Sequence, residues 1–276
     1  MRWLISCFLL CCLWLGIVMM PAAARPSAIA TSDNTEMVPA DSLKKLNEFS
    51  EQAFAATEQG DYATAETYWT RIIDLFPDNA AAWSNRGNAK VSQNQLEESL
   101  IDYTKSIELA PNAPDPYVNR GAALEGLSRW QEAIADYDQA LKLNPRDGGA
   151  LNNRGNAKGS LGNWAGAKAD FELAMQADPR QAMARANHAI ALYELGETDA
   201  AIREMRGILR KYPNFVDVRA ALTAVLWQEN KRGEAESNWV SVENLDNRYR
   251  DLNWVKTIRR WSPKLTLALE KFLSLQ

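Results

Sequence analysis

The sequence predicts an all-α protein, an α-solenoid of about six stacked helix hairpins, and three observations support this prediction. The tripeptide Asn-Arg-Gly recurs at 85–87, 119–121 and 153–155, a step of 34 residues. Between these copies, apolar residues follow two short helical patterns joined at a polar or glycine-containing turn. Prolines keep the same step, at Pro77, Pro111, Pro145, Pro179 and Pro213. A fixed period of this length indicates a repeat array, in which each hairpin buries its apolar face by stacking on its neighbours.

Composition narrows the function classes. The chain has 276 residues and a formal net charge of -4, which argues against a nucleic-acid binder because such proteins usually present a basic face. Cys7, Cys11 and Cys12 all lie in an apolar N-terminal stretch, and His188 is the single histidine. Once that stretch is removed, no thiol remains for a disulfide, a metal site or a nucleophile, and one histidine does not make a metal centre. Since no phosphate-binding glycine loop or nucleophile elbow is found, we expect no cofactor, no metal, no small-molecule substrate and no enzymatic activity.

The N-terminal stretch has the parts of a secretory signal peptide. Arg2 precedes an apolar run over 3–20, and small residues follow it. Residues 1–24 are therefore expected to direct export, with an alternative cut after residue 30. The apolar run also just reaches the length that spans a bilayer, so an uncleaved anchor is the other interpretation. Residues 25–40 are rich in Ala, Ser, Thr and Pro and are expected to form a flexible linker.

Counting back from each proline divides the chain into six units, which are 46–79, 80–113, 114–147, 148–181, 182–215 and 216–249. The eighth position of the units is small, as Ala53, Gly87, Gly121, Gly155, Ala189 and Thr223. The twentieth is almost always alanine, as Ala65, Ser99, Ala133, Ala167, Ala201 and Ala235. The twenty-fourth is large, as Trp69, Tyr103, Tyr137, Phe171, Met205 and Trp239. Small residues let two helix axes approach each other, and the large residue is expected to fill the space between them.

This register resembles the tetratricopeptide repeat, which has a small residue, an alanine, an aromatic residue and a terminal proline at matching positions. The resemblance covers 46 to about 249. It implies a right-handed α-solenoid of about six units over 41–249. After Ser262-Pro263, apolar residues at helical spacing predict an amphipathic closing helix, so residues 250–276 are expected to form C-terminal capping helices. The sixth unit departs from the pattern, because Asn247 stands where proline is expected. Terminal units of such stacks are often atypical, since they must close the core.

Two charged positions vary together across the units. Arginine occupies the seventh position and aspartate the twenty-third, in the pairs Arg86 with Asp102, Arg120 with Asp136 and Arg154 with Asp170. We interpret them as a ladder of ion pairs that fixes the register of paired helices, and His188 with Glu204 as its counterpart in the fifth unit. The alternative is that the arginine stems lie along the surface beside solvated acids.

The resemblance implies that certain positions of each first helix line a peptide-binding groove. The sixth position is asparagine in four consecutive units, as Asn85, Asn119, Asn153 and Asn187, and the ninth adds Asn88 and Asn156. A carboxamide offers two donors and an acceptor, so a row of them is suited to hold an extended peptide backbone. Asparagine also recurs at this position without a ligand, so a structural role is the competing interpretation.

Two aromatic residues fall at the twelfth position, Tyr193 and Trp227, and are expected to anchor an apolar side chain of a ligand or to pack on the C-terminal helices. A subset of the family clamps the carboxylate of chaperone tails with basic residues at groove positions. The corresponding positions here hold Ser50, Phe54, Asp115 and Asn119, so that ligand is not expected.

The end of the chain, with Asn253-Trp254-Val255, Arg259-Arg260-Trp261-Ser262-Pro263 and Lys271-Phe272-Leu273, resembles the tail of tetratricopeptide proteins of cyanobacteria and plastid lumens. With the leader, this likeness implies the thylakoid lumen or the periplasm. We expect a protein–protein interaction scaffold or assembly factor, with photosynthetic complexes among its candidate partners. The alternative is a structural subunit of an envelope or membrane-associated assembly.

Overall fold

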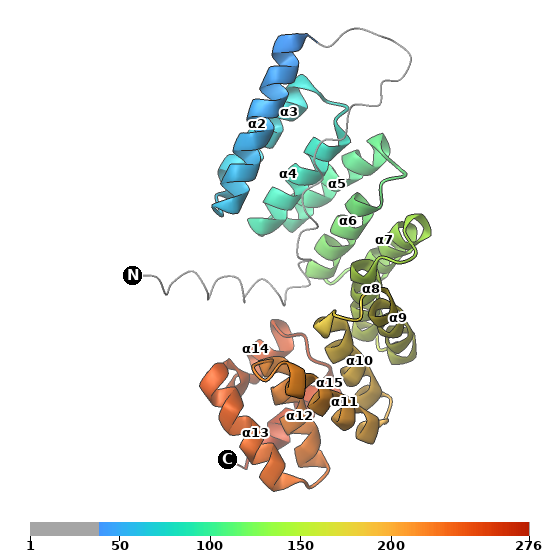
Figure 1. Cartoon of the computed structure of the whole chain (residues 1–276), viewed down its shortest axis with the longest axis vertical. Helices are drawn as coiled ribbons and strands as arrows, with labels where there is room; N and C mark the ends of the chain where they lie inside the picture. Colours follow the sequence, from blue (N-terminus) through green and yellow to red (C-terminus); the bar gives the residue numbers. More distant parts are fainter. Residues whose placement is uncertain (1–38, 276) are drawn as a thin grey trace. The chain divides into compact units, whose positions relative to one another are not determined.

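The computed structural model describes residues 39–275, so the predicted signal peptide and most of the predicted linker lie outside it. Over this range the chain forms only helices, as the sequence predicts (Figure 1). They pair in chain order as first and second helices of successive hairpins. The hairpins are α2 (Ala40–Glu58) with α3 (Tyr62–Leu75), α4 (Ala80–Ser92) with α5 (Leu96–Leu109), α6 (Pro114–Gly126) with α7 (Trp130–Leu143), α8 (Gly148–Ser160) with α9 (Trp164–Ala177), α10 (Ala182–Glu194) with α11 (Thr198–Lys211), and α12 (Val216–Gln228) with α13 (Arg232–Leu245). A 3₁₀ turn, η2 (Asn247–Arg250), then leads to α14 (Leu252–Thr257) and α15 (Pro263–Leu273).

The described chain divides at residue 145 into two bodies. The N-terminal body comprises residues 39–145, with helices α2–α7. The C-terminal body comprises residues 146–275, with helices α8–α15. In each body a first helix contacts its own second helix and the second helix before it, as α4 does with α5 and α3. Neighbouring first helices also contact each other directly, as α4 with α6 and α8 with α10.

Short polar sequences begin the helices and turn the chain within each hairpin. Several first turns are capped by a side chain, such as Asn79, whose carboxamide oxygen accepts from the backbone N–H of Ala82 at 3.1 Å. The two helices of a hairpin are joined at a polar or glycine-containing turn, as the sequence predicts. One residue of the turn has a positive φ, as Gly60 and Gly196 do. Glycine adopts this conformation at little cost, and Asn94 and Asn230 take its place in the second and sixth units.

The small and large positions meet inside each hairpin. A Cβ atom on Gly87 would lie 2.7 Å from the ring of Tyr103, and one on Gly155 would lie 2.5 Å from the ring of Phe171. Ala133 is fully buried between α6 and α7. The predicted role of these positions in close helix packing is therefore confirmed.

Ala133→Leu is expected to lower the free energy of unfolding by about 1–3 kcal/mol, because the side chain would be forced into a filled interface. Urea denaturation followed by circular dichroism measures the change. Ala135 lies exposed on the same helix, so Ala135→Leu is the matched control and should leave the midpoint nearly unchanged. Equal midpoints for the two variants would contradict the packing register.

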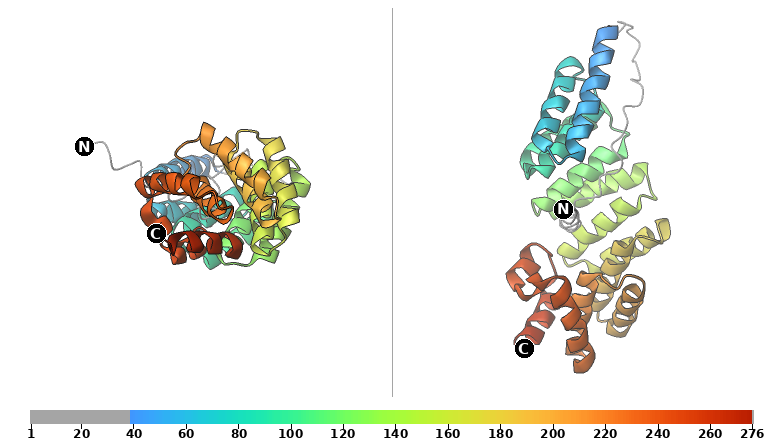
Figure 2. Two further views of the ribbon diagram at one scale, coloured as in Figure 1. Left: turned by 90° about the horizontal axis from the view of Figure 1, so that it is seen from below. Right: turned by 60° about the vertical axis from the view of Figure 1, so that its left-hand side comes forward.

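The last two hairpins share one apolar core with the end of the chain. Leu265, Leu269 and Phe272 of α15 are fully buried. The Phe272 ring packs edge-on against Trp227 of α12, with centroids 5.2 Å apart. Figure 2 shows the C-terminal helices folded back beside the last hairpins of this body. The amphipathic closing helix predicted from the sequence thus covers α12.

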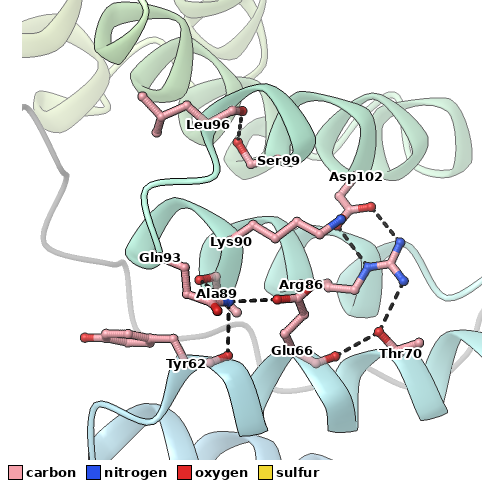
Figure 3. Close-up of polar contacts among 10 residues, drawn as sticks. All are labelled: Tyr62, Glu66, Thr70, Arg86, Ala89, Lys90, Gln93, Leu96, Ser99 and Asp102. Atoms are coloured by element: carbon pink, nitrogen blue, oxygen red, sulfur yellow. Dashed lines mark hydrogen bonds and ion pairs between the residues drawn. The ribbon is translucent and has the colours of Figure 1, made fainter.

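The predicted charge ladder is also present. In Figure 3, Arg86 of α4 lies between Asp102 of α5 and Thr70 of α3. Its guanidinium donates two hydrogen bonds to Asp102, at 2.9 and 2.7 Å, and Lys90 pairs with the same carboxylate at 2.7 Å. The pairs Arg120–Asp136 and Arg154–Asp170 repeat the 2.7 Å contact. The ion-pair interpretation is confirmed over the solvated alternative, since all three aspartates are buried.

Candidate peptide-binding face

In the N-terminal body, two of the predicted amides sit on neighbouring first helices. Asn85 lies on α4 and Asn119 on α6, and both side chains are half-buried. The Asn79 cap begins α4, and Pro114 at the first position begins α6, so the same register carries each amide. Neither carboxamide forms a hydrogen bond with another described residue. Both therefore keep their donors and their acceptor for a ligand.

Asn88 has a structural partner. Its Oδ1 accepts a hydrogen bond from the Tyr103 hydroxyl at 2.8 Å. Burial raises the pKa of Tyr103, so the phenol stays protonated and remains a donor. Asn88 thus links the two helices of the second hairpin, and only its amide nitrogen is left for other contacts.

In the C-terminal body, the predicted amides bond to one another. The Nδ2 of Asn187 on α10 donates to Asn156 Oδ1 at 2.9 Å and to Asn152 Oδ1 at 3.0 Å, both on α8. We call these three residues the amide cluster. Asn153 lies beside it and accepts a weak bond from Asn152 at 3.4 Å, and its own Nδ2 is buried without a partner among the described residues.

The role of Asn152 was not anticipated from the sequence, although a third asparagine in the same turn as Asn153 and Asn156 was a signal. Four carboxamides on two touching first helices are close enough to form hydrogen bonds with one another. Asn156 and Asn187 therefore have a structural role, the alternative to ligand binding, because their hydrogen bond links α8 to α10. For Asn85 and Asn119, binding stays a prediction.

The predicted aromatic pair is covered by the end of the chain. Tyr193 is 5% exposed and lies 4.3 Å from the Lys264 ammonium, measured to the ring centroid. Trp227 packs on Phe272, as described above. Packing on the C-terminal helices, the second of the two sequence-based expectations, accounts for these contacts, and ligand binding by either ring stays a prediction.

The segment that covers these rings also meets charged groups of the first helices. Ser262 donates to Glu194 Oε1 at 2.5 Å, and the pKa of Glu194 is raised, mainly by burial. Arg259 pairs with Asp217 of α12, and both side chains are buried. The tail therefore occupies the first-helix face of the last two hairpins with polar as well as apolar contacts.

Residues 39–275 contain no group of three His, Cys, Asp or Glu side chains placed to hold a metal ion. In the same range no helix has the length and apolar character needed to cross a bilayer.

Three family models described as tetratricopeptide repeat match the chain, over residues 51–114, 114–147 and 160–236. The chain is 46% identical over 48 residues to Hsp70-Hsp90 organizing protein 3 of Arabidopsis thaliana. That stretch is 17% of this chain and 9% of that protein, so the chain matches about a tenth of its curated relative.

Solved structures show the same fold. A tetratricopeptide repeat protein from Parabacteroides merdae superposes with a TM-score of 0.67 at 22% identity, over 84% of this chain and 93% of that chain. YrrB, described as a TPR protein with an unusual peptide-binding site, superposes with a TM-score of 0.55 at 19% identity. The match covers 74% of this chain and 97% of YrrB. At these identities the likeness establishes the architecture.

Proposed function

Because the chain belongs to the tetratricopeptide repeat family, we propose that it is a non-enzymatic scaffold or assembly factor that binds peptide segments of other proteins along its first helices. Proteins of this fold typically mediate protein–protein interactions, and YrrB is described as binding a peptide. The observation that carries the proposal is the pair of unpartnered amides at the same position of two touching helices, Asn85 and Asn119.

These two amides fit an extended backbone. Packed helices lie about 8–10 Å apart, and an extended chain rises about 3.3 Å per residue, so about three ligand residues would separate the two contacts. A carboxamide can donate to a peptide carbonyl and accept from a peptide N–H at once. Recognition of this kind reads the main chain, so it tolerates many side chains in the ligand.

The class of ligand differs from that of the chaperone-tail clamp. The relevant positions hold Ser50, Phe54, Asp115 and Asn119, and none of these can form an ion pair with a terminal carboxylate. The short match to Hsp70-Hsp90 organizing protein 3 therefore supports protein binding, and an internal peptide segment is the ligand that we propose.

We further propose that the protein is exported and acts in a thylakoid lumen or periplasm, on photosynthetic complexes. The apolar leader over 1–24 and the likeness of the tail to proteins of those compartments support this. Fractionation of cells that express the full chain, with a protease-protection assay, tests the location. Recovery with the cytoplasmic fraction would overturn it.

A structural subunit held through the C-terminal helices is less favoured, because the apolar face of α15 is already buried within the protein.

The double variant Asn85→Ala/Asn119→Ala is expected to reduce partner capture about tenfold or more, because each lost hydrogen bond contributes about 1 kcal/mol. Affinity capture from an extract, followed by quantitative mass spectrometry against the unaltered protein, measures the loss. Circular dichroism should show unchanged helicity and melting, since neither amide has a partner within the described protein.

The matched control is Asn112→Ala/Asn144→Ala. Both control residues are exposed. Asn112 lies in the turn between α5 and α6, and Asn144 is the C-cap residue of α7. Partners that are lost from the first double variant and retained by the control would define the ligands of this face. Equal capture by both variants would remove Asn85 and Asn119 from the mechanism.

A further inference from the structure

The single histidine takes the ladder position of the fifth hairpin. His188 is 9% exposed on α10, between the second helices α9 and α11. Its Nδ1 lies 2.7 Å from Glu204 Oε2 on α11, and its Nε2 lies 3.4 Å from Glu172 Oε1 on α9. Arg120 contacts α7 and α5 in the same way, through Asp136 and Thr104. His188 therefore performs the two-sided contact that arginine performs in earlier hairpins.

An imidazole differs from a guanidinium in one respect that matters here. Arginine stays charged at any pH that a protein tolerates, whereas the ordinary pKa of histidine is 6.5. A protonated imidazole donates from both nitrogens and so satisfies both glutamates. A neutral imidazole has one N–H, so its other nitrogen presents a lone pair to a carboxylate.

Several other charged groups of the neighbouring helices are engaged elsewhere. On α9, Asp170 pairs with Arg154 and Lys158 of α8, and Lys168 pairs with Glu197 at 2.8 Å. On α11, Arg206 pairs with Glu234 of α13. On α12, Asp217 pairs with Arg259, and Arg219 donates to Asn238 and to the Pro213 carbonyl. Glu172 and Glu204 are the charged side chains in contact with the ring.

Glu172 and Glu204 raise the pKa of His188 by more than burial lowers it. Burial of the imidazole lowers its pKa, but the hydrogen bond and charge of Glu204, with those of Glu172, outweigh it and raise the pKa of His188. A raised pKa in the folded state means that the contacts stabilise the fold fully below pH 6.5. That contribution is lost as the pH rises through the folded-state pKa.

We propose that His188 is a pH-sensitive joint that clamps α10 between α9 and α11 when protonated and releases this clamp at alkaline pH. The neighbouring residue on α10, Asn187, belongs to the amide cluster and bonds to α8. No other hairpin among residues 39–275 has a titratable cation with this ordinary pKa at the ladder position.

The first test follows the ring itself by NMR. Because the protein has one histidine, its imidazole resonance is assigned without ambiguity. The titration midpoint is expected above 6.5, and lower in Glu204→Gln and in Glu172→Gln than in the unaltered protein. A midpoint at or below 6.5, or one that neither variant moves, would overturn the proposal.

The second test is the melting temperature at pH 6.0 and pH 8.5. The unaltered protein is expected to melt about 2 °C lower at pH 8.5. His188→Arg, which restores the earlier ladder residue, should show a clearly smaller drop. His188→Gln should melt at a lower temperature at pH 6.0 and should also show a smaller drop in melting temperature at pH 8.5. The test therefore holds even if arginine fits poorly at this position.

Glu194 on the same helix is a second group whose ionisation affects stability. Burial raises its pKa, so its contribution falls as the pH rises from 4.5 through its folded-state pKa, with the same sign as that of His188. Glu194→Gln therefore serves as a control that keeps the His188 contribution. If both His188 variants retain the full drop of the unaltered protein, the joint is not at this residue.

Discussion

Asp102→Asn is expected to lower the free energy of unfolding by about 3–5 kcal/mol, the range measured when one member of a buried ion pair is removed. The Asp102 side chain is 1% exposed and is shared by Arg86 and Lys90. An asparagine still accepts one hydrogen bond, but two cations would then face each other without a counter-charge. Urea denaturation followed by circular dichroism measures the loss.

Asp136 provides the comparison. It occupies the same ladder position but pairs with Arg120, and the neighbouring first-helix residue that corresponds to Lys90 is the buried Leu124. The Arg120 side chain is 24% exposed, so water screens it better after the change. Asp136→Asn should therefore cost less than Asp102→Asn. Asp74→Asn, on an exposed part of α3, is the neutral control. The ladder would have no structural role if all three variants unfolded at the same urea concentration.

Phe272→Ala is expected to cost about 3–5 kcal/mol in the stability of the C-terminal body, through lost burial and the cavity left behind. Its ring is fully buried between Trp227 and Trp239, at centroid distances of 5.2 Å from each. Because α15 covers α12 through this residue, its loss should also expose the tail to proteolysis. Denaturation curves and limited proteolysis measure the two effects.

Leu267→Ala is the control for that variant. Leu267 lies on the same helix and is 50% exposed, so its removal creates no cavity. A tail that is cleaved at the same rate in both variants would show that Phe272 does not anchor α15. Loss of stability without faster cleavage would show that the core weakens as a whole and not at the tail.

Much of the hairpin architecture was predictable because it depends on spacing. Gly87, Gly121 and Gly155 occur once in each repeat unit. Each faces a large ring on the second helix of its own hairpin, so these contacts follow from the register. The same holds for the ladder, where an arginine and an aspartate 16 residues apart meet across every hairpin that contains both. The periodicity of the sequence carries this information, since each unit packs on its neighbours through the same positions.

The candidate site was less predictable. Six asparagines look alike in the sequence, yet Asn88 bonds to Tyr103, and Asn187 joins Asn156 in the amide cluster. Whether an amide is left without a partner depends on which side chain lies opposite it on another helix. A neighbouring tyrosine or a second asparagine decides this, and neither is part of the repeat signal.

The sequence by itself determined the helix hairpins, their register and the charge ladder, because one set of small, large and charged positions recurs at a constant step. Only the tertiary structure decided that α15 covers Trp227 and that Lys264 lies over Tyr193. It also decided that the carboxamides of Asn85 and Asn119 stay unpartnered, while the Nδ2 of Asn187 bonds to Asn152 and Asn156. These outcomes depend on where the non-repeating tail folds back and on contacts between residues of different hairpins. The repeat pattern of the sequence contains neither kind of information.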